Sequence, residues 1–223
     1  MATIRLVPST YAVSNSSYVT VTSPSNMYNN TDHTSNYASI KGRNSSSNTY
    51  YCYVRGFNFD DVPSNATVSA FSVKIRAYRN SYLSTSSSYY LRLCNGTSAI
   101  SNTTLSSALT TTSTVYTFPT SSLSWSTIKN YGSNFGIYIP LRRGSSSGTP
   151  YVYVYGVEIE VTYTLPTPYT ISVTGASPAG SNTVYEGDSF TVYATTSQYP
   201  EKPVVTDNDV DVTSSVTQSS NQW

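Results

Sequence analysis

The clearest pattern along the chain is an alternation of apolar and polar residues over positions 67–78. The apolar members are Phe71, Val73, Ile75 and Ala77, and the members between them are Ser72, Lys74, Arg76 and Tyr78. A period of two is that of a β-strand with one face in a protein core. The segment therefore predicts a strand whose aliphatic side is buried.

Six further segments combine strand-forming residues and are separated by runs of Ser, Gly and Asn, which predict loops. They are residues 17–22, 36–42, 49–58, 88–95, 114–118 and 134–142. No helical period of convincing length occurs, and the helix formers Glu, Lys, Gln and Met are scarce. These features predict an all-β fold.

An eighth strand is predicted over residues 150–163, and its pattern changes in the middle. Val152 and Val154 share one parity, whereas Val157, Ile159 and Val161 share the other. Gly156 lies at the change, which suits a β-bulge that resets the buried face. The alternative is that Tyr151, Tyr153 and Tyr155 face the core instead.

The stretch Leu165-Pro166-Thr167-Pro168 has two prolines in four residues and predicts an extended linker. We expect a jelly-roll-like β-sandwich over residues 1–165 and an immunoglobulin-like domain over 166–223. In the second domain we expect strands at 169–174, 189–195 and within 203–216, with turns at 175–181 and 186–188. Such a domain needs ~100 residues, so we expect the chain to continue past Trp223.

The charge of the chain argues against two classes of partner. Only 10% of residues are charged and the net charge is +1, with no basic run longer than Arg142-Arg143. Phosphate backbones and anionic lipids are recognised by clustered Lys and Arg. We therefore expect neither nucleic acid nor membrane insertion. Residues 1–10 lack the apolar segment of a secretory signal, although the Ser/Thr/Asn-rich composition suits a location outside cells.

Cys52 and Cys94 are the two cysteines of the chain. In a secreted protein they would suggest a disulfide, whereas assembly in a reducing cytoplasm favours free, buried thiols. We favour free thiols, because a domain of this size does not need a covalent staple.

No residue pattern predicts catalysis, a metal or a cofactor. The single histidine, His33, adjoins Asp32, but sequence neighbours rarely form a catalytic pair. The run Asp207, Asp209, Asp211 starts like a calcium loop, yet lacks that loop's glycine and final glutamate, so a solvated turn or strand face is favoured. Glu158 and Glu160 share a strand face and are interpreted as exposed alternates.

Tyrosine is the residue type best suited to molecular contact, and the chain has 22 of them. Its ring gives rigid contact area and its hydroxyl a hydrogen bond. Tyr151, Tyr153 and Tyr155 form one candidate row for an oligomer interface or a glycan platform, and Tyr89 and Tyr90 form another patch. The alternative is that all are ordinary residues of half-buried strands.

Three stretches resemble the N-terminal β-sandwich domain of virion proteins from phages that infect Firmicutes and other gut bacteria. They are FNFDDVPSNATVSAFSVKIRAY (57–78), NFGIYIPLRRG (134–144) and GVEIEVTYT (156–164). Two later stretches, YEGDSFTVYA (185–194) and VTDNDVDVTSSV (205–216), are similar to immunoglobulin-like modules of phage tail, fibre and head-decoration proteins.

This resemblance implies a structural or adhesive role and no catalytic residue. The expected partners are other virion proteins of the capsid or tail and further copies of the chain, with a host-surface glycan as an additional target. The expected location is the virion, assembled in the bacterial cytoplasm. A carbohydrate-binding module of a secreted bacterial protein is the rival hypothesis, since β-sandwiches host many unrelated functions.

Overall fold

A computed structural model describes residues 1–173, 177–185, 190–191, 205–207 and 210–211. The chain divides into two compact units, Met1–Thr164 and Leu165–Trp223. Strands dominate the described residues of both units, so the predicted all-β class is confirmed. None of the helices among the described residues is long and apolar enough to cross a membrane.

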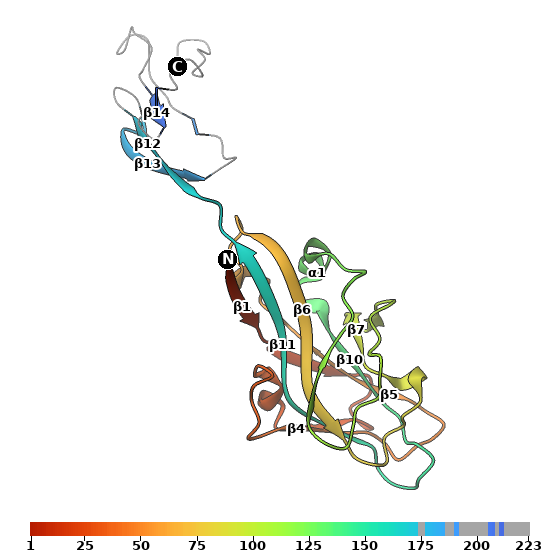
Figure 1. Ribbon diagram of the computed structural model, residues 1–223. Helices are drawn as coiled ribbons and strands as arrows, with labels where there is room; N and C mark the ends of the chain where they lie inside the picture. The colour runs from red at the N-terminus through yellow and green to blue at the C-terminus, as the bar shows by residue number, and fades with distance from the viewer. Residues whose placement is uncertain (174–176, 186–189, 192–204, 208–209, 212–223) are drawn as a thin grey trace. The chain divides into compact units, whose positions relative to one another are not determined.

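The first unit consists of two antiparallel sheets (Figure 1). The first sheet has the order β3-β4-β11-β6-β9, and β1 also pairs with β11. The second sheet has the order β2-β5-β10-β7-β8. The strands of the first sheet are β1 (Ala2–Leu6), β3 (Thr20–Thr22), β4 (Ala38–Lys41), β6 (Thr67–Arg79), β9 (Thr114–Thr117) and β11 (Tyr151–Thr164). Those of the second are β2 (Thr10–Val13), β5 (Tyr50–Arg55), β7 (Arg92–Asn95), β8 (Ser98–Ala99) and β10 (Phe135–Leu141).

Eight of these strands have jelly-roll connectivity. The pairs β4 with β11, β5 with β10, β6 with β9 and β7 with β8 are nested, so the segment behaves as one long hairpin folded over itself. Its first and third pairs lie in the first sheet, and its second and fourth pairs lie in the second sheet. Eight strands in two sheets connected in this way form a jelly roll, and the predicted jelly-roll-like sandwich is confirmed.

The core lies between the two sheets. The predicted alternation in β6 is confirmed, because Val73, Ile75 and Ala77 are fully buried. The switch of parity in β11 is confirmed as well, with a shift of register between Val154 and Gly156. Each fully buried valine, leucine, isoleucine or phenylalanine side chain stabilises the fold by about 1.5–3 kcal/mol. The fully buried aliphatic and aromatic side chains of β10 and β11 are Phe135, Ile137, Ile139, Leu141, Val152, Val154, Val157, Ile159 and Val161.

The structure also has elements that the sequence pattern did not reveal. Strands β1, β2 and β8 were not predicted, and the expectation of no helix was wrong. Helix α1 (Trp125–Tyr131) begins after Ser124, whose hydroxyl accepts a hydrogen bond from the Thr127 amide at 3.1 Å. Four short 3-10 helices are η1 (Pro24–Tyr28), η2 (Phe59–Asp61), η3 (Ser87–Tyr89) and η4 (Gly132–Asn134).

In the second unit, the described strands form one antiparallel sheet of order β13-β12-β14-β15. They are β12 (Pro168–Val173), β13 (Gly180–Tyr185), β14 (Val205–Asp207) and β15 (Val210–Asp211). Strand β13 was not predicted and begins inside the expected turn at 175–181. The expected turn at 186–188, most of the expected strand at 189–195, and Asp209 of the acidic run lie outside the described residues. The immunoglobulin-like identity of this unit stays a prediction.

Cys52 and Cys94 are free, buried thiols on the second sheet. Burial raises the pKa of each to about 12, because a thiolate would lose its hydration there. We expect neither thiol to react with a thiol reagent such as DTNB at pH 8 in the folded protein, and both to react in denaturant. Rapid titration of one thiol without denaturant would contradict this.

Candidate functional site

Five tyrosines gather on the outer side of the first sheet, and we call them the tyrosine face. They are Tyr37, Tyr78, Tyr151, Tyr153 and Tyr155. The structure thus joins the three tyrosines predicted from β11 with two others. The rings of Tyr78 and Tyr153 stack at 4.5 Å between centroids with planes 17° apart, and Tyr151 stacks on Tyr153 at 5.8 Å and 6°.

Tyr37 completes this face from a loop. Its ring meets Tyr153 edge-on at 5.1 Å, Tyr155 at 5.5 Å and Tyr78 at 5.8 Å. It is also the most exposed large apolar side chain of this region, at 40%. Edge-to-face and stacked pairs each add about 0.5–1.5 kcal/mol beyond the area they bury. The five rings therefore form a rigid surface rather than a set of independent side chains.

The surroundings of the tyrosine face favour the protonated hydroxyls of Tyr78 and Tyr153. The pKa of Tyr78 is raised, first by partial burial and then by its hydrogen bond with Tyr37. The pKa of Tyr153 is raised as well, again mainly by burial. Protonated hydroxyls can both donate and accept hydrogen bonds, so the face offers polar contacts without a charge that a partner would have to neutralise.

A bulge in β11 shapes the end of the face. Val154 pairs with Ala77 and Gly156 with Arg76, so Tyr155 is the extra residue without a partner in β6. The bulge lies where β11 changes its other neighbour from β4, which pairs with residues 151–154, to β1, which pairs with residues 159–163. A bulge redirects the side chains that follow it. It therefore ends the tyrosine row and returns the aliphatic residues to the core.

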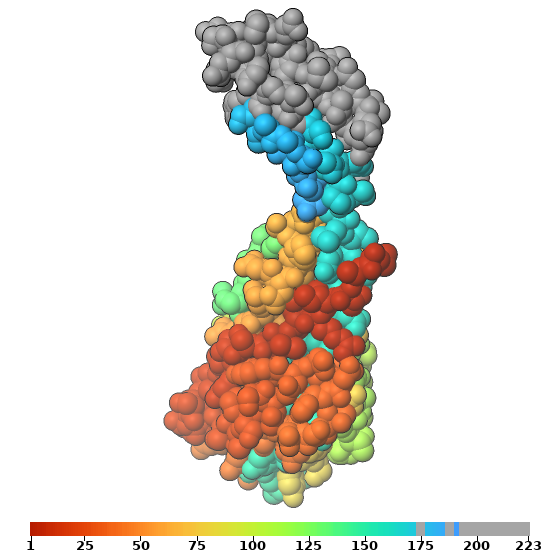
Figure 2. All heavy atoms as spheres, turned by 90° about the vertical axis from the view of Figure 1, so that its left-hand side faces the viewer, coloured from red at the N-terminus to blue at the C-terminus, as the bar shows by residue number. Residues whose placement is uncertain are grey.

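The loop that carries Tyr37 is fastened to this bulge. The Val157 amide donates to the carbonyl of Asn29 at 2.8 Å. A Cβ atom on Gly156 would lie 2.1 Å from the carbonyl oxygen of Asn30 and 2.6 Å from that of Asn29. Only glycine allows the loop backbone to come this close. Figure 2 shows segments from the first quarter of the chain, in red and orange, covering one face of the first unit.

Glu158 provides a second fastening point beneath the same loop. Its carboxylate is 1% exposed and accepts hydrogen bonds from the Thr31 hydroxyl at 2.9 Å and the Thr31 amide at 3.1 Å. The guanidinium of Arg76 donates to the Thr31 carbonyl. The interpretation of Glu158 as an exposed alternate was wrong, because the loop covers this part of the outer face.

Cations neutralise the buried carboxylate. Arg5 and Lys74 lie 3.9 Å and 4.0 Å from Glu158, and Lys74 also pairs with the half-buried Glu160 at 3.0 Å. Arg5 also bonds Asp32, and this hydrogen bond holds the pKa of the Asp32 carboxyl below its ordinary value. The arrangement is a network of ion pairs that stabilises the loop.

Tyr89 and Tyr90 lie at η3 and its end, and among the described residues no ring contact joins them to the tyrosine face. The Arg142 guanidinium lies over the Tyr89 ring, 4.8 Å from the ring centroid.

A further tyrosine cluster, which was not predicted, lies on the second sheet. There the ring centroids of Tyr51 and Tyr53 lie 4.7 Å and 5.6 Å from that of Tyr138. The sequence carried a signal for this cluster, because Tyr51 and Tyr53 alternate with the buried Cys52 and Val54 along β5.

In the described part of the chain, no three His, Cys, Asp or Glu side chains come close enough to hold a metal ion. His33 is half-buried, and its Nε2 atom has no hydrogen-bond partner.

Comparisons of the chain with protein-family models, with curated proteins and with solved structures find no match.

Proposed function

We propose that this chain is a structural protein of a bacteriophage virion surface, on a head fibre, head decoration or tail, and that it works by contact rather than by catalysis. Its jelly-roll unit mediates assembly through the tyrosine face, and the following unit is an immunoglobulin-like module. The partners are other virion proteins of the capsid or tail and further copies of the chain. The protein assembles in the bacterial cytoplasm.

The tyrosine face is the observation that carries this proposal. Tyrosine is enriched and charge is depleted at the centres of protein interfaces, and both conditions hold there. The five rings are held by one another and by an anchored loop, so little conformational entropy is lost when a partner binds. Jelly rolls occur in viral capsid proteins and in lectins, and the fold therefore suits a protein that works by surface contact.

Assembly can be tested with Tyr153→Ala, which removes the central ring of the face. Central aromatic residues of interfaces contribute 2 kcal/mol or more, so we expect the dissociation constant of self-association to rise at least about 30-fold. Analytical ultracentrifugation over a concentration series measures it. The control is Tyr82→Ala, because Tyr82 is an exposed tyrosine, at 37%, that lies outside the face.

Two results together would overturn the proposal. One is a strictly monomeric chain at high concentration, and the other is its absence from purified phage particles. Self-association that Tyr153→Ala and Tyr82→Ala weaken equally would remove the tyrosine face from the proposal.

A carbohydrate-binding module is the second candidate, because stacked tyrosine rings also suit the apolar faces of sugars. A glycan array separates the two candidates. Saturable sugar binding that Tyr153→Ala abolishes, from a chain that stays monomeric, would favour the module.

A further inference from the structure

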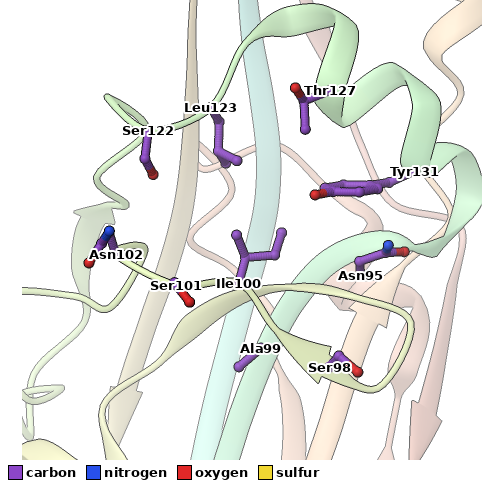
Figure 3. A pocket seen from close by; sticks show the side chains of 10 residues that line it. All are labelled: Asn95, Ser98, Ala99, Ile100, Ser101, Asn102, Ser122, Leu123, Thr127 and Tyr131. Carbon is purple, nitrogen blue, oxygen red and sulfur yellow. The ribbon is translucent and has the colours of Figure 1, made fainter.

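An open groove lies at the edge of the second sheet, between the β7–β8 hairpin and the segment that leads into α1 (Figure 3). Its volume is about 490 Å³, within the range of about 300–1,000 Å³ typical of small-molecule sites. None of its residues belongs to the tyrosine face. The lining residues are Asn95, Ser98, Ala99, Ile100, Ser101, Asn102, Ser122, Leu123, Thr127 and Tyr131.

Hydrogen bonds and ring packing hold both walls of the groove in place. On one side the buried Thr103 hydroxyl donates to the Ile100 carbonyl at 2.7 Å and accepts from the Leu93 amide at 3.1 Å. On the other side the ring of Tyr131 stacks on the buried Phe135 at 6.4 Å with planes 15° apart. The groove is therefore largely formed before any ligand arrives.

The lining is uncharged and mixes hydroxyl, amide and apolar groups. Ile100 and Leu123 supply aliphatic surface, and Figure 3 shows the Tyr131 hydroxyl directed toward the space between these two side chains. Within the described residues, the side chains of Asn95, Asn102 and Ser122 make no hydrogen bond to the protein. These amide and hydroxyl groups are free to bond a ligand.

This chemistry selects one class of ligand. An anion would need a cationic or buried donor, and the lining has no Lys, Arg or His. A peptide added to the sheet edge would need a longer strand than β8, which has two residues. A neutral sugar has many hydroxyls and apolar C–H faces, and it matches a lining of amides, hydroxyls and a few apolar side chains.

We propose that this groove binds a neutral saccharide. The aliphatic side chains of Ile100 and Leu123 contact the C–H faces of the sugar, and Asn95, Asn102 and the Tyr131 hydroxyl bond its hydroxyl groups. The site is independent of the proposed assembly role, because it uses different elements and a different surface.

The test measures binding of the full chain to immobilised neutral oligosaccharides, such as glucan, mannan and galactan hexamers. Sialylated and sulfated glycans serve as charged comparison ligands, the charged arms of the test. We expect saturable binding to at least one neutral glycan. Asn95→Ala and Tyr131→Phe each remove one hydrogen bond, and each should raise the dissociation constant about fivefold. Ala99→Trp, at an exposed position, should fill the groove and abolish binding. The control Asn130→Ala changes an exposed residue of α1 outside the groove and should have no effect.

NMR titration with the best neutral glycan gives a second readout, since shifts confined to 95–102 and 122–131 would support the site. Binding to none of the neutral glycans at millimolar concentration would overturn the proposal. So would a preference for the charged arms, or neutral-glycan binding that Ala99→Trp leaves intact and Tyr153→Ala abolishes. Each of these results leaves the sedimentation test of assembly unaffected, so the two proposals fail separately.

Discussion

Gly156→Ala is expected to lower the free energy of unfolding of the first unit by about 3 kcal/mol, the upper part of the range for overpacked sites. The new Cβ would lie 2.1 Å from the Asn30 carbonyl oxygen and 2.6 Å from that of Asn29. Neither neighbour is a flexible side chain, so the loop backbone must move away. That movement breaks the hydrogen bond from the Val157 amide to Asn29.

Thermal unfolding followed by circular dichroism measures this effect. For a unit of this size, 3 kcal/mol corresponds to a fall in Tm of about 6–12 °C. The matched control is Gly144→Ala, where the nearest atom to a new Cβ is 3.6 Å away, and we expect a change within about 0.5 kcal/mol. Neither glycine has a positive φ angle, so the comparison isolates the steric clash.

The same substitution should also disturb the tyrosine face, since the displaced loop carries Tyr37. Hydrogen exchange at the Val157 amide would report the loss of the anchor directly. Equal stability of the Gly156→Ala and Gly144→Ala proteins would mean that the loop does not lie against the bulge as described.

The buried face of β11, including its bulge, could be predicted from the sequence alone. The change of parity between Val154 and Val157, with Gly156 between them, predicted the correct inner face of β11 because the side-chain period of a strand is strictly two. For the same reason, the alternation in β6 identified its buried side. The three tyrosines of β11 then had to lie together on the opposite face.

The outer face was not predictable in the same way. Tyr37 reaches the tyrosine row because it directly precedes β4, whose Ala38 pairs with Val154 of β11, and no period in the sequence records which strands pair. The loop fastened at Thr31 buries Glu158, a residue whose alternation alone predicts exposure. Tertiary covering of an outer face overrides the strand pattern, and local reasoning cannot detect it.

Helix α1 and strands β1 and β2 were missed for a different reason. The helix has seven residues, which is too short to show a clear helical period. Its capping residue Ser124 was a signal, but serine is so frequent in this chain that a single one carries little information. Strands β1 and β2 have only five and four residues and depend on pairing with β11 and β5.

Glu158→Gln is expected to lower the free energy of unfolding of the first unit by about 2–3 kcal/mol. The carboxylate accepts two hydrogen bonds from Thr31, and bonds to charged groups contribute about 1.5–3 kcal/mol. A glutamine is neutral and has one acceptor oxygen, so both bonds lose the negative charge, and the second persists only if the Thr31 hydroxyl turns to accept from the NH2 group. Arg5 and Lys74 would also lose the negative charge between them.

Glu160→Gln is the matched control, because it removes the same charge from the same strand face and from the same two cations. Glu160 is 30% exposed, and exposed ion pairs contribute about 0–1 kcal/mol, so we expect less than 1 kcal/mol in urea unfolding. High salt should reduce this small effect further while leaving that of Glu158→Gln almost unchanged, since buried pairs are poorly screened. Equal losses for the two variants would mean that net charge, rather than the buried hydrogen bonds to Thr31, holds the loop that presents Tyr37.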